Sequence, residues 1–472
     1  MSIQSVLKNA IKRLKPTKKE SQDVQHQVKT IIDELTIGLK NFYPDIEVHV
    51  EGSIAKNTWI SNSKEIDIFI LLPSEATREH LQDVLSTVKN VIKAQWIERY
   101  AEHPFLEFSI NDYKVEIVPC FKVLDSKHLK SAVDRTPLHT RYVNKKMTQQ
   151  LRDDVRLLKG FTKGIGVYGA ELKIGGFSGY LCELLIIAYS GFLRLLQEAT
   201  SWTTGTVIDI QNHYKNFNDL RELFDSPLIV VDPIDVSRNV ASALTLKKFS
   251  IFVAAAGEFL RTPHLHFFFP PSLPKLSVKE VVSRMESRGT HFLFLVFPVP
   301  SVVSDILWGQ LYKSVSAFHN FLERNDFPVF RKDVWTDEQT IVIIIFELEH
   351  ISIPYVVKRF GPPTTSPQHA AKFIKKYIKS KDTLSGPWIN EDGRWVVEIK
   401  RDFTKAEDLL AKKIFANYLE EIGLGKYIKM ELPSAKIYLD AEIASLLKET
   451  PDFLDFFTNY LVKTPKWLTK NT

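Results

Sequence analysis

The sequence contains little cysteine and no long apolar run, and each shortage excludes a class of protein. Cys120 and Cys182 are the only cysteines, too few for a disulfide framework or a cysteine-based zinc site. The longest apolar runs, such as residues 184–189 and 341–346, fall far short of the roughly 20 residues that a membrane-spanning helix needs. Residues 1–19 are rich in lysine and lack the apolar core of a signal peptide. We therefore expect a cytoplasmic protein without a membrane partner.

The chain also lacks a strong excess of either charge. Its 62 lysine and arginine residues and 56 aspartate and glutamate residues leave a formal net charge of +6. A mild basic excess is compatible with binding a polyanion, but it is also common among proteins that bind none. At 472 residues the chain exceeds what one hydrophobic core usually supports, so we expect about two to four domains.

An acidic strand is the most informative feature that the chain does have. Residues at i and i+2 of a strand project from the same face, so Glu65 and Asp67 in Glu65–Leu72 hold two carboxylates side by side. Like charges on one face repel, and a divalent cation removes that repulsion. Paired metal ions are how polymerases clamp a triphosphate for in-line displacement. The strand therefore predicts nucleotidyl transfer.

A third carboxylate on a neighbouring strand usually completes a site of this kind. The candidate is Glu116, a lone acid between apolar residues of a predicted strand at 113–119. An exposed glutamate on a half-solvated strand is the alternative interpretation. With Glu65 and Asp67 upstream, we interpret Glu116 as the third metal ligand.

Gly52 and Ser53 lie at a predicted strand-to-helix junction upstream of the acidic strand. Free backbone N–H groups and a hydroxyl at such a junction can bind phosphate oxygens, and glycine lets the backbone approach closely. Lys56 follows about one turn later and would direct a charge at the same phosphates. The alternatives are a plain helix N-cap for Ser53 and a solvated side chain for Lys56.

Hydrophobic periodicity divides the chain into three sections. A mixed α/β section with a small sheet is followed from about residue 144 by a helical section, and a Pro- and Phe-rich stretch at residues 263–274 is typical of a linker before an α+β tail. The predicted helices cover residues 22–42, 79–92, 153–162, 179–197, 305–325 and 368–380, and the predicted strands cover 46–50, 65–72, 106–110, 113–119, 290–297, 340–348 and 394–399.

A series of short motifs runs in order from about residue 51 to residue 241. They are EGSIAKNTW (51–59), EIDIF (65–69), RYAEHP (99–104), VPC (118–120), KSAVDRTP (130–137), LLKGF (157–161), YGAE (168–171), GFSGYLCELL (176–185), VDPID (231–235) and RNVA (238–241). Together they resemble the class I, archaeal-type CCA-adding enzymes, which are tRNA nucleotidyltransferases of the polymerase β-like superfamily.

The resemblance implies an α+β multidomain fold. A polymerase β-like nucleotidyltransferase head with a mixed sheet would occupy residues 1–143, a helical neck that recognises the base residues 144–262, and an α+β body and tail that bind tRNA residues 263–472. Glu65, Asp67 and Glu116 would be catalytic and bind Mg²⁺, although the family usually has aspartate where this chain has Glu116. The nucleotide-binding residues would be Gly52, Ser53, Lys56, His139, Lys159, Tyr168 and Arg238, with Arg238 at the base-selecting end. By sequence alone, His139, Lys159 and Tyr168 are more typical of structural or solvated positions.

The implied activity is the addition or repair of the 3′-terminal CCA of tRNA from CTP and ATP, without a nucleic-acid template and by two-metal in-line transfer. The tRNA acceptor arm and 3′ end would be recognised by shape and phosphate contacts. The resemblance also suggests a homodimer. A related poly(A) polymerase or oligoadenylate synthase, and a catalytically inactive RNA-binding relative, stay open as alternatives. A basic cluster could serve RNA binding or form a solvated helix face: Lys372, Lys375, Lys376, Lys379 and Lys381.

Overall fold

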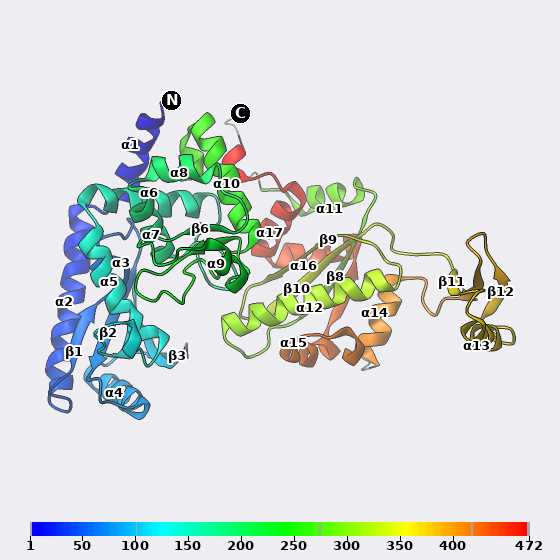
Figure 1. Ribbon diagram of the computed structural model, residues 1–472, viewed down its shortest axis with the longest axis horizontal. Helices are drawn as coiled ribbons and strands as arrows, with labels where there is room; N and C mark the ends of the chain where they lie inside the picture. The colour runs from blue at the N-terminus through cyan, green and yellow to red at the C-terminus, as the bar shows by residue number, and fades with distance from the viewer. Residues whose placement is uncertain (1, 101, 273–274, 417–418, 470–472) are drawn as a thin grey trace. The chain divides into compact units, whose positions relative to one another are not determined.

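The computed structural model describes residues 2–100, 102–272, 275–416 and 419–469 (Figure 1). The chain divides into two compact units. The first comprises residues 1–272 together with 465–472, and the second comprises residues 273–464. The multidomain α+β prediction is confirmed, since each unit combines helices with sheets.

The first unit contains a mixed sheet with the strand order β1-β2-β5-β4-β3. Strands β2 and β5 at its centre are parallel, and the other neighbours are antiparallel. The acidic strand has its predicted bounds, whereas β3 was not predicted because all of its residues are exposed and no apolar alternation marks it. The strands are β1 (Glu47–Val50), β2 (Glu65–Leu72), β3 (Ile97–Tyr100), β4 (Pro104–Ile110) and β5 (Tyr113–Phe121).

One face of this sheet is covered by helices, and the other carries the acids. Helices α2 (Lys18–Lys40) and α4 (Arg78–Val91) share a hydrophobic core with the alternate apolar residues of β2 and β5. Figure 1 shows α2 running along the sheet beside β1. Because side chains alternate along a strand, burying Ile66 and Ile68 turns Glu65 and Asp67 to the opposite face.

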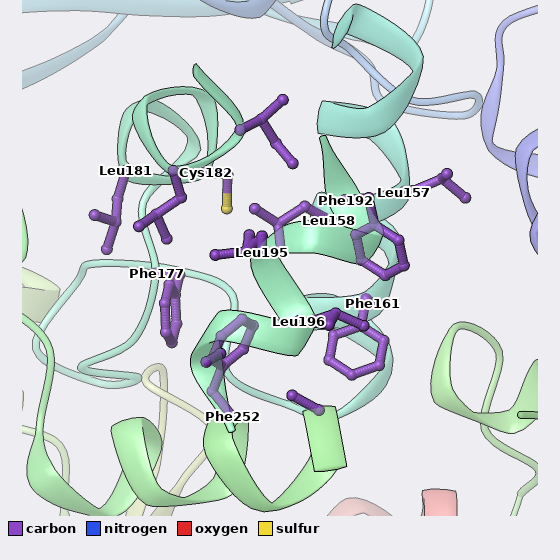
Figure 2. Packing of buried hydrophobic residues seen from close by; sticks show 14 of the residues in the cluster. Leu157, Leu158, Phe161, Phe177, Leu181, Cys182, Phe192, Leu195, Leu196 and Phe252 are labelled. Carbon is purple, nitrogen blue, oxygen red and sulfur yellow. The ribbon is translucent and has the colours of Figure 1, made fainter. Parts of the chain in front are cut away.

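A helical layer forms the rest of the first unit. Its core is built from apolar side chains of α6, α7, α8 and α10, which meet in Figure 2. Aromatic packing dominates there, with Phe161 in contact with the rings of Phe192 and Phe252. The helices are α1 (Ile3–Leu14), α3 (Gly52–Ala55), α5 (Arg135–Lys146), α6 (Gln149–Gly164), α7 (Gly179–Tyr189), α8 (Phe192–Ala199), α9 (Phe217–Leu223) and α10 (Leu246–Arg261), with the short parallel strands β6 (Thr206–Ile208) and β7 (Leu228–Val230).

The single helix predicted at residues 179–197 is wrong, because α7 ends before α8 begins. Ser190 has a φ of 56° and Gly191 a φ of 147°, and neither value continues an α-helix. The two helices meet at an angle of 91°. Among the described residues, no single helix is long and apolar enough to cross a membrane, and this bent pair passes that test only when both helices are taken together.

Part of the predicted linker at residues 263–274 packs into the first unit instead. Phe267 and Phe268 are buried in its core. The Trp467 ring stacks on Phe267 with a centroid distance of 5.3 Å, which brings the end of the described chain back to this unit. The phenylalanines of this stretch explain why it is not a linker. Burying their large apolar rings is favourable, and an exposed linker would leave the rings in water.

The second unit is organised around an antiparallel sheet with the order β14-β8-β10-β9. Both faces are covered, which explains why β8 and β10 are continuous apolar runs rather than alternating ones. The strands are β8 (His291–Pro298), β9 (Val329–Thr336), β10 (Ile341–Leu348) and β14 (Lys436–Leu439). The covering helices are α12 (Ser304–Arg324), α14 (Ala406–Phe415) and α15 (Lys426–Glu431) on one face, and α11 (Val278–Glu286), α16 (Ala444–Glu449) and α17 (Pro451–Val462) on the other.

A smaller sheet in the second unit has the order β11-β13-β12. Strands β11 (Val356–Pro363), β12 (Thr383–Ile389) and β13 (Arg394–Lys400) accompany helix α13 (Pro367–Tyr377). The lysine cluster predicted around α13 is exposed throughout. Both RNA binding and a solvated helix face require exposed lysines, so exposure does not distinguish the two interpretations.

Candidate active site

The predicted acidic residues lie next to one another on the face of the sheet opposite helices α2 and α4. The parallel register of β2 and β5 places Asp67 opposite Glu116, and Glu65 opposite Lys114. Glu65 is exposed and Asp67 is half-buried. The three carboxylates therefore share one face of two neighbouring strands, as the sequence predicts.

Asp67 lies in surroundings that disfavour its charge. Burial, and then the negative charges of Glu116 and Glu65, raise the pKa of Asp67 to about 7, although Lys56 acts in the opposite direction. In the described part of the chain, the Asp67 carboxylate accepts no side-chain or backbone hydrogen bond and forms no ion pair. A carboxylate without a protein partner is free to bind an added cation such as a divalent metal ion.

Glu116 is paired with a lysine on its own strand. Nζ of Lys114 lies 2.7 Å from Oε1 of Glu116 and 3.1 Å from Oε2 of Glu107. Burial lowers the pKa of Lys114, but its bonds to Glu116 and Glu107 raise it by more. Among the described residues, no three His, Cys, Asp or Glu side chains are arranged to hold a metal ion together. Ligation by Glu116 stays a prediction, and it requires release from Lys114.

The Gly52 backbone lies directly against the acidic strand. Gly52 has a φ of +64°, and a Cβ at this position would lie 1.8 Å from Oδ2 of Asp67. The backbone N–H of Glu51 also donates to the Asp67 carbonyl at 2.8 Å. Only glycine satisfies both the conformation and the close approach. The loop that carries Ser53, in the first turn of α3, therefore borders the acidic pair.

Lys56 and Lys159 meet at a buried carboxylate, that of Glu183. Nζ of Lys56 donates to Oε2 of Glu183 at 2.6 Å, and Nζ of Lys159 lies 3.6 Å from Oε1. The Thr58 hydroxyl donates to Oε1 at 2.6 Å and accepts from Lys159 at 3.1 Å. Burial raises the pKa of Glu183, but the two lysines lower it by more, so the net shift is downward and the carboxylate is ionised.

Tyr168 borders the same place. A Cβ on Gly179, at the start of α7, would lie 3.2 Å from the Tyr168 hydroxyl and 3.7 Å from Nζ of Lys159. Burial raises the pKa of Tyr168, so its hydroxyl stays protonated and can donate a hydrogen bond. The structure thus brings Lys56, Lys159 and Tyr168 together from three segments.

His139 and Arg238 converge on a second buried carboxylate, that of Asp232. Nε2 of His139 lies 3.0 Å from Oδ2 of Asp232, and Nη1 of Arg238 donates to the same oxygen at 2.8 Å. The Tyr180 hydroxyl donates to Oδ1 at 3.1 Å, and the Tyr180 ring stacks on His139 at 4.0 Å between centroids. Burial lowers the pKa of His139 despite the Asp232 charge, so the imidazole is neutral near pH 7.

The two groups of residues are joined through Tyr180. Nζ of Lys56 lies 5.6 Å from the centre of the Tyr180 ring, which also stacks on His139. Five of the residues predicted to bind nucleotide therefore belong to one connected cluster in the first unit: Lys56, Lys159, Tyr168, His139 and Arg238. Gly52 and Ser53 lie in α3, directly before Lys56. Glu183, Thr58, Asp232 and Tyr180 complete the cluster and were not singled out by sequence reasoning. Glu183 had a recognisable signal, because a charge inside an apolar helix needs a buried partner.

Side chains of helix α6 bind the backbone of the segment that follows α3. Arg152, Arg156 and Lys159 follow one another at helical spacing and contact residues 56–59. Nε of Arg156 donates to the Trp59 carbonyl at 2.9 Å, and its Nη2 donates to Oδ1 of Asn57 at 2.7 Å. These bonds fix the backbone that carries Lys56 and Thr58.

Comparisons with known proteins agree with this arrangement. The family model described as "tRNA nucleotidyltransferase, second domain" matches residues 153–269, and that described as "CCA-adding enzyme, C-terminal domain" matches residues 288–440. The CCA-adding enzyme of Methanosarcina acetivorans is 39% identical, over 98% of this chain and 99% of that protein. The chain belongs to the CCA-adding enzyme family. The predicted nucleotidyltransferase and its family are thereby confirmed.

A second curated relative has the same name, and the chain also has other similarities. The CCA-adding enzyme of Methanothermobacter thermautotrophicus is 35% identical, over 96% of this chain and 97% of that protein. Residues 1–134 match the "Second Messenger Oligonucleotide or Dinucleotide Synthetase domain". A solved structure of the Cid1 poly(U) polymerase, 15% identical, covers 56% of this chain and 96% of its own with a TM-score of 0.44.

Proposed function

We propose that this member of the CCA-adding family adds or repairs the 3′-terminal CCA of tRNA from CTP and ATP without a nucleic-acid template. The observation that supports it most is the contact of Gly52 with Asp67. That contact joins an acidic strand to the cluster of Lys56 and Lys159, and a nucleotidyltransferase needs both kinds of group, one for the attacking hydroxyl and one for the triphosphate.

Mg²⁺ fits the acidic face because Asp67 and Glu65 offer carboxylate oxygens without partners among the described residues, and oxygen is the ligand that Mg²⁺ prefers. Glu116 would join them once its carboxylate leaves Lys114. When bound in a two-metal arrangement, the ions supply charge neutralisation for the attacking and leaving oxygens of in-line transfer.

The residues of this cluster have distinct roles in the proposed reaction. Lys56 and Lys159 neutralise the triphosphate, Tyr168 donates a hydrogen bond to it, and Ser53 and the Gly52 backbone border its reacting end. The charges are fixed before the nucleotide arrives, so little reorganisation accompanies the reaction.

The nucleobase would be recognised by four residues of the cluster: His139, Tyr180, Asp232 and Arg238. A neutral imidazole and a guanidinium present fixed hydrogen-bonding groups at which the Watson–Crick edges of cytosine and adenine can be distinguished from those of uracil and guanine. In this proposal residues 1–143 perform catalysis and residues 144–262 select the base.

Residues 263–472 would bind the tRNA acceptor arm, with the exposed lysines around α13 as candidates for phosphate contacts. A homodimer is compatible with this division of tasks, since catalytic and base-selecting residues all come from one unit of one chain. The free thiols of Cys120 and Cys182 support a reducing compartment, the cytoplasm.

The test uses a transcript of tRNA that lacks CCA, with labelled CTP, ATP and Mg²⁺. The expected product is longer by C, C and A, and a transcript that already ends in CCA is the negative control. Incorporation of ATP alone, or long tails, would favour the poly(A) polymerase or oligoadenylate synthase alternative. The inactive RNA-binding alternative predicts no incorporation, with the same function retained by D67A.

A further inference from the structure

Glu183 is a buried charged residue that has no role in the proposed catalytic steps. Its side chain is 1% exposed and lies on α7, inside a run of apolar residues. Burying an ionised carboxylate is unfavourable unless charges and hydrogen bonds compensate for it. A helix that needed only stability would have an apolar residue at this position, so the charge requires a different explanation.

The partners of Glu183 come from separate parts of the first unit. Lys56 ends α3, Thr58 lies in the segment after it, and Lys159 belongs to α6. Each of the two Glu183 oxygens has a different set of partners, with Lys56 on Oε2 and both Thr58 and Lys159 on Oε1. The carboxylate therefore ties the segment that borders the acidic strand to the helices beneath it.

We propose that Glu183 is a positioning residue that holds the ammonium groups of Lys56 and Lys159 side by side for the triphosphate. The inference rests on the proposed function, because it assumes that these two lysines bind nucleotide phosphates. Glu183 carries the same sign of charge as a phosphate, so it acts through the lysines and does not itself bind the nucleotide.

Elementary electrostatics explains why the lysines need such a residue. A lysine has a flexible four-carbon stem, and two ammonium groups in a buried site repel one another. One carboxylate between them offsets part of that repulsion and leaves a net positive charge for an anionic ligand. The Thr58 hydroxyl donates to the carboxylate oxygen nearest Lys159 and accepts from that lysine, so the two ammonium groups have separate oxygens.

The test compares nucleotides that differ in phosphate number. The binding of CTP and of CMP is measured by isothermal titration calorimetry for the full chain, for E183Q and for E198Q, a matched control on the exposed side of α8. E183Q is expected to lose about tenfold or more of its CTP affinity and much less of its CMP affinity, while E198Q binds both like the wild type. Unchanged CTP affinity, or equal losses for CTP and CMP, would overturn the proposal.

A double-mutant cycle identifies the path of the effect. If Glu183 acts through Lys56, then E183Q in a K56M background should weaken CTP binding far less than E183Q alone, because the lysine that it positions is gone. Additive losses would contradict a positioning role. Thermal unfolding of each variant separates a change in affinity from a loss of folded protein.

A second variant keeps the proposal testable if E183Q does not fold. T58V removes the hydroxyl between Glu183 and Lys159, and T58S keeps it. T58V should show the same selective loss for CTP, and T58V that binds CTP like T58S would overturn the proposal. A wild-type chain that binds no CTP would overturn this inference and the proposed function together, whereas normal wild-type binding with an unaffected E183Q overturns only the inference.

Discussion

Two carboxylates on central strands, Asp67 on β2 and Glu347 on β10, have opposite electrostatic surroundings. Glu347 is fully buried and accepts hydrogen bonds from Arg288 at 2.7 Å, from Arg331 at 2.6 Å and from the Thr290 hydroxyl at 2.7 Å. Burial raises the pKa of Glu347, but these partners lower it by more. Asp67 has no such partner in the described chain, and its pKa is raised to about 7.

The difference separates a structural carboxylate from one that awaits a ligand. A buried acid with complete partners stabilises the fold around it, and its removal leaves the partners uncompensated. A buried acid without partners lowers stability and persists only where function requires it.

The largest expected effect is that of Asp67→Asn on catalysis. The substitution keeps the shape and removes the charge, so we expect single-turnover addition to tRNA to fall about a thousandfold or more. The melting temperature should stay unchanged or rise, because an unpaired buried charge is lost. A variant that retains substantial activity would contradict the catalytic assignment.

Glu347→Gln should have the reverse profile. Arg288 and Arg331 would lose their counter-ion, and we expect the free energy of unfolding of the second unit to fall by about 3 kcal/mol. Urea denaturation, followed by a probe in that unit, measures the change. Activity per folded molecule should remain near that of the wild type at low temperature. A loss well below 1 kcal/mol would show that the comparison with Asp67 is wrong.

The pH dependence of stability should also differ in sign between the two acids. The folded-state pKa of Asp67, about 7, exceeds the ordinary value of 3.8, so the folded chain binds a proton more readily than the unfolded one between these values. Without metal, stability relative to D67N should fall as pH rises from about 4 to 7, by about 1.4 kcal/mol per unit at most. Glu347 has a lowered pKa, and its contribution should be lost only in acid.

Thermal unfolding of wild type and D67N in EDTA, across that pH range, measures the difference. Added Mg²⁺ should remove the dependence, because a bound cation favours the ionised carboxylate. A difference between wild type and D67N that does not change with pH would contradict the raised pKa.

The smallest expected effect concerns Lys114. Replacing it with methionine releases the Glu116 carboxylate, and Mn²⁺ affinity, measured by electron paramagnetic resonance, should rise about two- to fivefold. Lys64→Met is the matched control, since Lys64 pairs with the exposed Asp112 instead. If both variants bind Mn²⁺ equally, Lys114 does not compete for the site.

The acidic face of the sheet could be predicted from the sequence because the residues that define it are close together in the chain. The alternation of Ile66 and Ile68 with Glu65 and Asp67 fixes which face holds the acids, and the requirement for glycine at position 52 follows from the same small region. The strand bounds agree for the same reason.

What the sequence does not reveal depends on long-range pairing. Glu183 meets Lys56 across 127 positions, and Asp232 meets His139 across 93. Lys114 and Glu116 are a local pair, since residues at i and i+2 of β5 share a face, and their contact was within reach of sequence reasoning although it was not predicted. The break at Ser190 and Gly191 depends on backbone conformation, which an apolar run on both sides conceals.

In the proposed function, the carboxylate of Asp67 receives a divalent cation beside the triphosphate. The most direct measurement is Mn²⁺ binding in the presence of CTP, followed by electron paramagnetic resonance for wild type, D67N and E347Q. We expect saturable Mn²⁺ binding to wild type and E347Q and the loss of this binding in D67N. Equal binding by D67N and wild type would contradict it.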